Sequence, residues 1–155
     1  MDKSNLDPAS VRILRELQQD ARLSVNELAE RVGMSASPCW RRQKELEENG
    51  FIRRYAALLD RRKLELGLVC VLHVSLTRHE AGVVDTFEAQ MKACSEVMEC
   101  YEVTGTSDYI VKVMVKDMDA YHDLLHNVLL KLPGVSQLNT SVALREVKYE
   151  TALPL

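Results

Sequence analysis

The sequence is poor in the features that mark membrane, secreted and fibrous proteins. Its longest apolar run, 67–72, is followed at once by His73 and is far shorter than the roughly 20 residues that span a bilayer. The polar N-terminus has no apolar core of the kind found in signal peptides. With 6 Gly and 4 Pro among 155 residues, the chain is neither collagen-like nor dominated by linkers. We therefore expect a globular, cytoplasmic protein of one ordinary domain or two small ones.

Cysteine pairs and catalytic motifs are also missing. The 4 cysteines form no Cys-x-x-Cys pair and are interpreted as reduced, mostly buried thiols: Cys39, Cys70, Cys94 and Cys100. There is no nucleophile elbow, P-loop or G-x-G-x-x-G, so an enzymatic function has no residues to support it. His122 and His126 have a spacing that can ligate zinc, but no third ligand follows at a suitable distance. A solvated helix edge is the favoured interpretation, and no metal or cofactor is expected.

Charge is distributed unevenly along the chain, although the net charge is only -3. Residues 1–63 hold 13 Lys and Arg against 10 Asp and Glu, whereas residues 64–155 hold 7 against 13. Such asymmetry indicates a basic binding module joined to an acidic module with another task. A pair of solvated helix faces would explain the same charges equally well.

The first half opens with signals for two helices. Asp7 is an N-cap acceptor placed before Pro8, which suits the first helical position. Ser24 and Glu27 have the spacing of a capping box, and Gly33 ends the short helix that they begin. The sequence therefore predicts two short helices between about residues 8 and 33.

A third helix follows the Gly33 turn. Ser35 or Ser37 can cap it, and Asn49-Gly50 stops it. Two short helices joined by a turn with glycine form a helix-turn-helix. The run 51–59 is β-prone and cationic, which predicts a strand or small wing leading out of the helical unit.

The physical case for DNA binding rests on this third helix. A major groove admits one α-helix, whose N-terminal outward residues reach base edges while Arg and Lys contact phosphates. The predicted DNA surface comprises Ser24, Ser35, Ser37, Pro38, Trp40, Arg41, Arg42, Lys44, Arg53 and Arg54. Two alternatives stay open: the helix cations can pair with the glutamates of the same helix, and Trp40 can pack beneath the wing instead of contacting DNA.

The second half repeats a strand-helix-strand pattern. Hydrophobic periodicity predicts strands over 68–76, 97–104, 109–115 and 135–145, and helices over 83–94 and 118–132. The order βαββαβ is the ferredoxin-like pattern, in which both helices cover one face of a four-stranded antiparallel sheet. The fold class is therefore α+β. The other face of the sheet has no cover within the chain, and dimerisation between sheets would bury it.

The segment Gly105-Thr-Ser-Asp108 joins two predicted strands. Its backbone N–H groups, hydroxyls and carboxylate can hold both ends of a free amino acid. Gly and Asp also favour turns, and from the residues alone a hairpin turn is the simpler interpretation.

Several short segments together resemble one family. They are LD at 6–7, LQQDARLS at 17–24, LAERVGMS at 28–35, SPCWRR at 37–42, GFI at 50–52, YAALL at 55–59, VTG at 103–105, DY at 108–109, LPGV at 132–135 and EVK at 146–148. In this order and spacing they resemble the Lrp/AsnC family of leucine-responsive and asparagine ("feast/famine") regulators. One departure is Gln43, which stands where the family usually has an aliphatic residue and could be semi-buried or face DNA.

The resemblance implies a domain plan. It predicts a winged helix-turn-helix DNA-binding domain over 1–53, a linker strand over 54–63, and a βαββαβ effector-binding and oligomerisation domain over 64–155. Family members dimerise through the sheet and often assemble into octamers. The expected partners are double-stranded DNA, further copies of the chain and a small effector.

The resemblance also makes the turn at 105–108 the favoured effector site. In the family, effectors that are commonly amino acids bind at this loop with help from the last strand. The predicted effector residues are Gly105, Thr106, Ser107, Asp108, Asn139, Thr140 and Ser141. We expect Asp108 to meet the effector's amino group and residues 105–107 to meet its carboxylate.

The sequence thus predicts a sequence-specific transcription regulator whose DNA binding or assembly responds to a small effector, most plausibly an amino acid. An architectural DNA-binding protein without an effector is the alternative, because the same basic surface would suffice. A small-molecule enzyme built on the βαββαβ domain is a third possibility, and no residue in the sequence supplies its nucleophile or metal.

Overall fold

The computed structural model of the protein describes residues 6–77 and 82–155, so the first five residues of the predicted first domain lie outside it. The chain divides into two compact units, one of Met1–Leu58 with Lys148–Leu155 and one of Leu59–Val147. The C-terminal residues therefore belong with the helical unit rather than with the sheet that precedes them. No helix within the described residues is long and apolar enough to cross a membrane.

The helical unit contains α1 (Pro8–Gln19), α2 (Val25–Val32) and α3 (Ala36–Glu48). Asp7 caps α1 as predicted, because its carboxylate accepts a hydrogen bond from the Ser10 N–H at 2.7 Å. The three helices enclose a small core in which these residues are buried: Ile13, Leu14, Leu17, Leu28, Ala29, Val32, Cys39 and Leu46. Helical spacing of these positions explains why each helix turns one apolar stripe inward.

Both ends of α2 are capped. The predicted capping box is present: the Glu27 N–H donates to Ser24 Oγ, and the Ser24 N–H donates to Glu27 Oε2 at 2.8 Å. Gly33 ends α2 with a φ of +69°, a conformation that favours glycine. Ser35 occupies the N-cap of α3, but its side chain makes no capping hydrogen bond.

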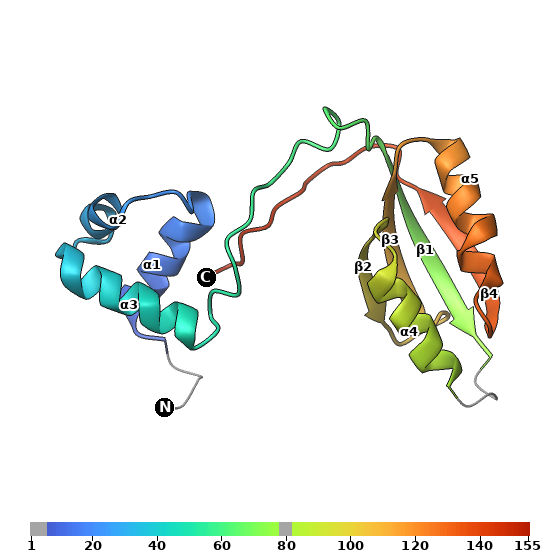
Figure 1. Ribbon diagram of the computed structural model, residues 1–155, viewed down its shortest axis with the longest axis horizontal. Helices are drawn as coiled ribbons and strands as arrows, with labels where there is room; N and C mark the ends of the chain where they lie inside the picture. The colour runs from blue at the N-terminus through green and yellow to red at the C-terminus, as the bar shows by residue number, and fades with distance from the viewer. Residues whose placement is uncertain (1–5, 78–81) are drawn as a thin grey trace. The chain divides into compact units, whose positions relative to one another are not determined.

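The strand predicted over 51–59 is not formed. Residues 53–60 follow an extended path without strand hydrogen bonds (Figure 1). A β-prone run becomes a strand only when another strand satisfies its N–H and C=O groups, and none pairs with it within the described part of the chain. The segment therefore leaves the helical unit as an extended connection.

The second unit is a four-stranded antiparallel sheet with two helices. Its elements are β1 (Leu68–Leu76), α4 (Val83–Ala93), β2 (Val97–Glu102), β3 (Tyr109–Val115), α5 (Met118–Asn127), the short 3-10 helix η1 (Leu129–Lys131) and β4 (Val135–Val142). The strand order is β2-β3-β1-β4, so β1 and β3 are central and β2 and β4 are edges. This is the predicted ferredoxin-like βαββαβ fold, with both helices on one face (Figure 1).

Three element ends differ from the sequence prediction. β2 stops at Glu102 and β4 at Val142, each a few residues early. α5 ends at Asn127 rather than near Pro133, because Val128 adopts φ -120° and ψ -67°, outside the helical region, before η1. Gly134, at φ +78°, closes against the Val83 side chain, which leaves no space for a Cβ.

Side chains alternate between the two faces of the central strands, and those that face the helices form the core. Tyr109, Val111, Val113 and Val115 are buried on the helix side of β3, while Ile110, Lys112 and Met114 are half-buried on the other side. The same alternation in β1 gives a second, largely apolar face that neither α4 nor α5 covers.

Candidate DNA-binding and effector sites

The outer surface of α3 presents an aromatic and a basic residue side by side. Trp40 is 52% exposed, so it does not pack beneath a wing. Arg41 is exposed, and it makes no hydrogen bond or ion pair with any residue that the structure describes. Ser37, one turn earlier, is also exposed, and Pro38 is half-buried. These side chains are free to meet a nucleic acid.

Arg42 points the other way, toward the start of α1. Its guanidinium forms an ion pair with Asp7 and lies 3.4 Å from the Ser10 hydroxyl. The Ser10 N–H and then Arg42 hold the pKa of the Asp7 carboxyl below its usual value. The side chain of Arg42 thus ties α3 to the cap of α1, and its predicted contact with DNA stays a prediction.

Lys44 and Gln43 belong to a polar cluster on the C-terminal half of α3. Lys44 Nζ lies 2.6 Å from Glu47 Oε2, which realises the predicted pairing within the helix. The Gln43 amide donates to the Tyr55 hydroxyl at 2.9 Å, and that hydroxyl donates to Glu47 Oε1 at 2.8 Å. Hydrogen bonding to Lys44 first, and to Tyr55, lowers the pKa of Glu47. Gln43 thus fastens the start of the extended segment to α3.

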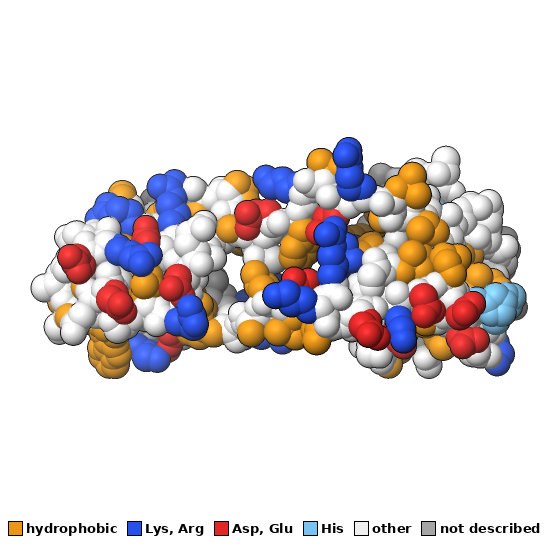
Figure 2. Space-filling model, turned by 90° about the horizontal axis from the view of Figure 1, so that it is seen from above, with side chains coloured by type: hydrophobic (Ala, Val, Ile, Leu, Met, Phe, Trp, Pro, Cys, Tyr) orange, Lys and Arg blue, Asp and Glu red, His pale blue; other side chains and the backbone are white. Residues whose placement is uncertain are grey.

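The remaining predicted DNA residues lie at the edges of this surface. Ser24 is exposed, but its hydroxyl is occupied by the capping box. Ser35 is exposed at the N-terminus of α3. Arg53 and Arg54 are exposed beyond α3, without a bonded partner among the described residues. On the face that Figure 2 presents, basic side chains are interspersed with acidic ones.

The loop after β2 borders an open depression of about 750 Å³, here called the loop depression. Residues 103–107 of the loop form one side, and Glu102, His73 and Ile110 complete it. Gly105 has a φ of +127°, which favours glycine, and the space around its Cα is open. The N–H groups of Gly105, Thr106 and Ser107 donate to no carbonyl in the described part of the chain. Residues with unbonded backbone N–H groups and with hydroxyls therefore border a hollow able to accept a carboxylate.

Asp108 fastens this loop to the sheet. Its Oδ2 accepts a hydrogen bond from the Leu76 N–H at 2.8 Å, and its own N–H donates to the Val74 carbonyl at 2.9 Å. Its carbonyl accepts from the Val103 N–H at 2.9 Å. Asp108 does not line the loop depression. In this conformation the side chain expected to hold the effector's amino group has a structural partner.

The three predicted residues of β4 do not share one surface. The Thr140 hydroxyl is hydrogen-bonded to the Tyr121 hydroxyl of α5, on the helix side of the sheet. Asn139 and Ser141 lie opposite His73 and Val71 of the neighbouring strand β1, on the uncovered face of the sheet. None of the three lines the loop depression within one chain. The structure therefore brings residues 105–107 together and leaves the β4 residues apart from them.

Sequence reasoning missed five residues of the loop depression: His73, Glu102, Val103, Thr104 and Ile110. A signal for two of them was present, because the alternation of β1 and β3 assigns His73 and Ile110 to the uncovered face. His73 of β1 and Ile110 of β3 lie opposite each other because of the antiparallel register of the two strands, and a single sequence does not specify that register.

Other reactive side chains do not form a site in the described residues. The ring centroids of His122 and His126 lie 4.3 Å apart on the exposed side of α5. Within residues 6–77 and 82–155, no group of three or more His, Cys, Asp or Glu residues is placed to hold a metal ion. All four cysteines are free thiols. Burial raises the pKa of each thiol, which makes them poor nucleophiles.

Family models match both units. Residues 6–53 match the winged helix-turn-helix DNA-binding model, and residues 69–153 match the Lrp/AsnC ligand binding domain. The second match alone covers more than half of the chain.

Curated relatives match along nearly the whole chain. The leucine-responsive regulatory protein of Salmonella typhimurium is 42% identical over 149 residues, covering 96% of this chain and 91% of the relative. The protein of the same name from Escherichia coli K12 is 41% identical over the same coverage.

Solved structures share this fold over nearly the whole chain. A transcriptional regulator from Neisseria meningitidis in complex with L-Met superposes with a TM-score of 0.93 at 38% identity, covering 97% of each chain. An AsnC family transcriptional regulator from Agrobacterium tumefaciens gives a TM-score of 0.92 at 34% identity, covering 96% of this chain and 97% of its own.

Proposed function

The chain belongs to the Lrp/AsnC family of transcription regulators, and on that premise we propose which surfaces perform its two tasks. The protein is a DNA-binding transcription regulator with an effector-binding domain, and it is not an enzyme. We propose that α3 reads operator DNA, that residues 105–107 hold the effector, and that the effector is an amino acid. Binding to chromosomal DNA would place the protein in the cytoplasm.

The observation that carries the DNA proposal is the presentation of Trp40 and Arg41 on the free side of α3. Arg41 can reach a base edge or a phosphate, and Trp40 can stack on a sugar or the groove wall. The exposed hydroxyl of Ser37 lies one turn earlier, toward the helix end that enters the groove in helix-turn-helix proteins. Arg53 and Arg54 are proposed to contact the neighbouring phosphates.

The amino-acid proposal is supported by the loop depression and by one relative. Free N–H groups at 105–107 suit the carboxylate that all amino acids share. The Neisseria meningitidis regulator was solved in complex with L-Met, which supports the same class of effector here. Asp108 is proposed to act chiefly by holding the loop, and a direct contact with the ammonium group would require it to give up part of that bonding.

Oligomerisation is proposed to connect the two tasks. Pairing of the uncovered sheet faces would make a dimer, and residues Asn139 and Ser141 on that face would then lie near a second copy. An effector bound at such a boundary would favour the assembly whose spacing of DNA-binding units it fits. An octamer, as is frequent in the family, is the proposed larger assembly.

A melting-temperature screen of the purified protein against the twenty amino acids tests the effector. A ligand that binds only the folded state raises the melting temperature by mass action. We expect one amino acid, or a few related ones, to raise it, and Ser107→Ala to reduce the shift. No shift with any amino acid at millimolar concentration, together with footprints that show no preferred sequence, would favour the architectural alternative.

A further inference from the structure

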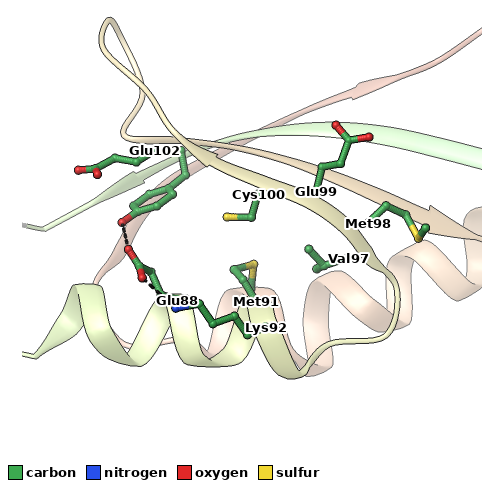
Figure 3. Close-up of a pocket in the computed structure, with 9 residues that line it drawn as sticks. Glu88, Met91, Lys92, Val97, Met98, Glu99, Cys100 and Glu102 are labelled. Carbon is green, nitrogen blue, oxygen red and sulfur yellow. Dashed lines mark hydrogen bonds and ion pairs between the residues drawn. The ribbon is translucent and has the colours of Figure 1, made fainter. Parts of the chain in front are cut away.

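A second hollow lies on the helix side of the sheet, between α4 and the edge strand β2 (Figure 3). This α4–β2 groove has a volume of about 390 Å³. Met91 of α4 is buried at its base, and Val97 and Cys100 of β2 are half-buried along its wall. Met98 stands at a shift in the β2–β3 register and is 53% exposed. The groove therefore offers an apolar, sulfur-rich wall that no described element covers.

One end of the groove is polar and acidic. The Tyr109 hydroxyl donates to Glu88 Oε1 at 3.1 Å, and Lys92 Nζ lies 3.2 Å from Glu88 Oε2. Figure 3 shows Glu88 and Glu102 at this end and Met98 at the other. Glu102 is exposed and makes no hydrogen bond or ion pair with a described residue. Burial first, and then the nearby carboxylates of Glu88 and Glu102, raise the pKa of the Tyr109 hydroxyl to about 12.

The charges at this end do not cancel. The positive charge of Lys92 neutralises the negative charge of Glu88, with which it forms an ion pair. The negative charge of the Glu102 carboxylate has no such partner among the described residues. A ligand with one positive charge and no negative charge complements this arrangement. A zwitterion would bring its own carboxylate toward the two glutamates, which opposes binding. The apolar wall selects for a short hydrocarbon or thioether chain attached to the charged group.

We propose that the α4–β2 groove binds a short-chain apolar primary amine, with the ammonium group at Glu102 and the chain against Met91, Val97 and Cys100. The side chain of Met98 covers the far end of the ligand. This site is separate from the proposed effector site in its face of the sheet and in its ligand class. Glu102 borders both hollows.

Nuclear magnetic resonance of the full chain, labelled at the methionine methyl groups, tests the groove directly. The signals of Met91 and Met98 are assigned with M91L and M98L variants. Three ligands of equal carbon skeleton are titrated: isopentylamine, the uncharged isopentanol, and L-leucine, which adds the carboxylate. We expect isopentylamine to shift both methyl signals saturably and to bind about fivefold or more tightly than either comparison ligand, as one exposed ionic contact allows.

Two variants with the same change of charge separate a specific contact from a general field. Glu102→Gln should weaken amine binding about fivefold. Asp119 is an exposed residue of α5, so Asp119→Asn removes the same charge from the same unit and should leave amine binding unchanged. The backbone amide signals of 105–107 report the proposed effector site independently in the same samples.

The outcomes are distinct. Saturable shifts of Met91 and Met98 that depend on the ammonium group and on Glu102 support the proposal. Equal binding of isopentanol, tighter binding of L-leucine at these methyl groups, an equal loss in both charge variants, or no saturable shift at tens of millimolar amine would each overturn it. A response of the 105–107 amides to an amino acid, without any response of the methyl groups to the amine, would overturn the groove proposal and leave the proposed function standing.

Discussion

Helix α3, which we propose reads DNA, and the loop before β3, which we propose holds the effector, solve the same structural problem in the same way. In α3, Arg41 is free on the outer surface, while its neighbour Arg42 is paired with Asp7 at the start of α1. In the loop, Ser107 borders the hollow, while its neighbour Asp108 is bonded to the β1 backbone. In each pair, one residue is proposed to contact a ligand and the next one fixes the element that carries both. A polar motif in a sequence therefore mixes two roles, and only the fold separates them.

The separation has a simple geometric origin in both places. Arg42 lies three residues after buried Cys39 and four before buried Leu46, so helical spacing turns it toward the core, whereas Arg41 is rotated away. Asp108 directly precedes β3, where its backbone must join the sheet. Ser107 is one residue further from that anchor. Neighbours in sequence thus differ in function because they differ in distance from the packed scaffold.

The comparison is tested most strongly on α3. We expect Arg41→Ala to weaken operator binding by about 1–3 kcal/mol while leaving the melting temperature unchanged. Arg42→Ala should instead lower the free energy of unfolding by about 1 kcal/mol, since a half-exposed ion pair and its hydrogen bond are lost. Operator titrations and urea unfolding of both variants measure the two effects. Equal losses of DNA binding per folded molecule would break the comparison.

The loop offers the parallel test. Asp108→Ala should destabilise the sheet unit by about 1–3 kcal/mol, because the half-buried Leu76 N–H loses its acceptor. Ser107→Ala should leave stability unchanged and reduce the shift in melting temperature that the effector causes. Thermal unfolding with and without effector distinguishes them. If Asp108→Ala unfolds like the wild type and abolishes only the effector shift, direct ligand contact by Asp108 is the better account.

Acid should weaken the anchor in the helical unit. The pKa of Asp7 is lowered in the folded state, so its stabilising contribution is fully present above the ordinary value of 3.8 and is lost as the pH falls through the folded pKa. Asp7→Asn keeps an N-cap but removes the titration and the ion pair. We expect the difference in stability between wild type and variant to be largest at neutral pH and to shrink below pH 4. A constant difference across that range would contradict the assignment.

The smallest effect concerns the attachment of the extended segment to α3. Tyr55→Phe removes the hydroxyl that links Gln43 and Glu47, at a cost of about 0.5 kcal/mol because the group is exposed. Hydrogen exchange of the Ile52 amide, which donates to the Leu46 carbonyl, should become faster, while exchange in α1 stays the same. Gln18→Ala provides a control, because the Gln18 side-chain amide exchanges hydrogen bonds with the backbone of Leu153 and so attaches the C-terminal residues to α1. It should speed exchange in residues 151–155 alone.

Local signals in the sequence predicted much of the scaffold. The structure confirms the predicted helix caps at Asp7 and Ser24 and the predicted strand over 109–115. These features could be predicted because each is determined by residues within a few positions of one another. The expected strand over 51–59 failed because a strand requires a partner, and β-propensity does not supply one.

The sites were predicted less well than the scaffold, for a related reason. Arg42 meets Asp7 from 35 positions away, and Asp108 meets Leu76 from 32 positions away. Gln43 pairs with Tyr55 in a segment whose path no local pattern determines. The residues offered to ligands could be named from composition and resemblance, but their separation from the anchoring residues depends on contacts distant in sequence.

The salt dependence of operator binding tests the central claim most directly. Each phosphate contact releases counterions, so the logarithm of the binding constant falls with the logarithm of salt concentration by a slope that counts such contacts. If Arg41 contacts a phosphate of the DNA and Arg42 serves the scaffold, Arg41→Ala should reduce the slope by about one, and Arg42→Ala should leave it at the wild-type value. A slope reduced by Arg42→Ala and unchanged by Arg41→Ala would show that the roles of the two neighbours are the reverse.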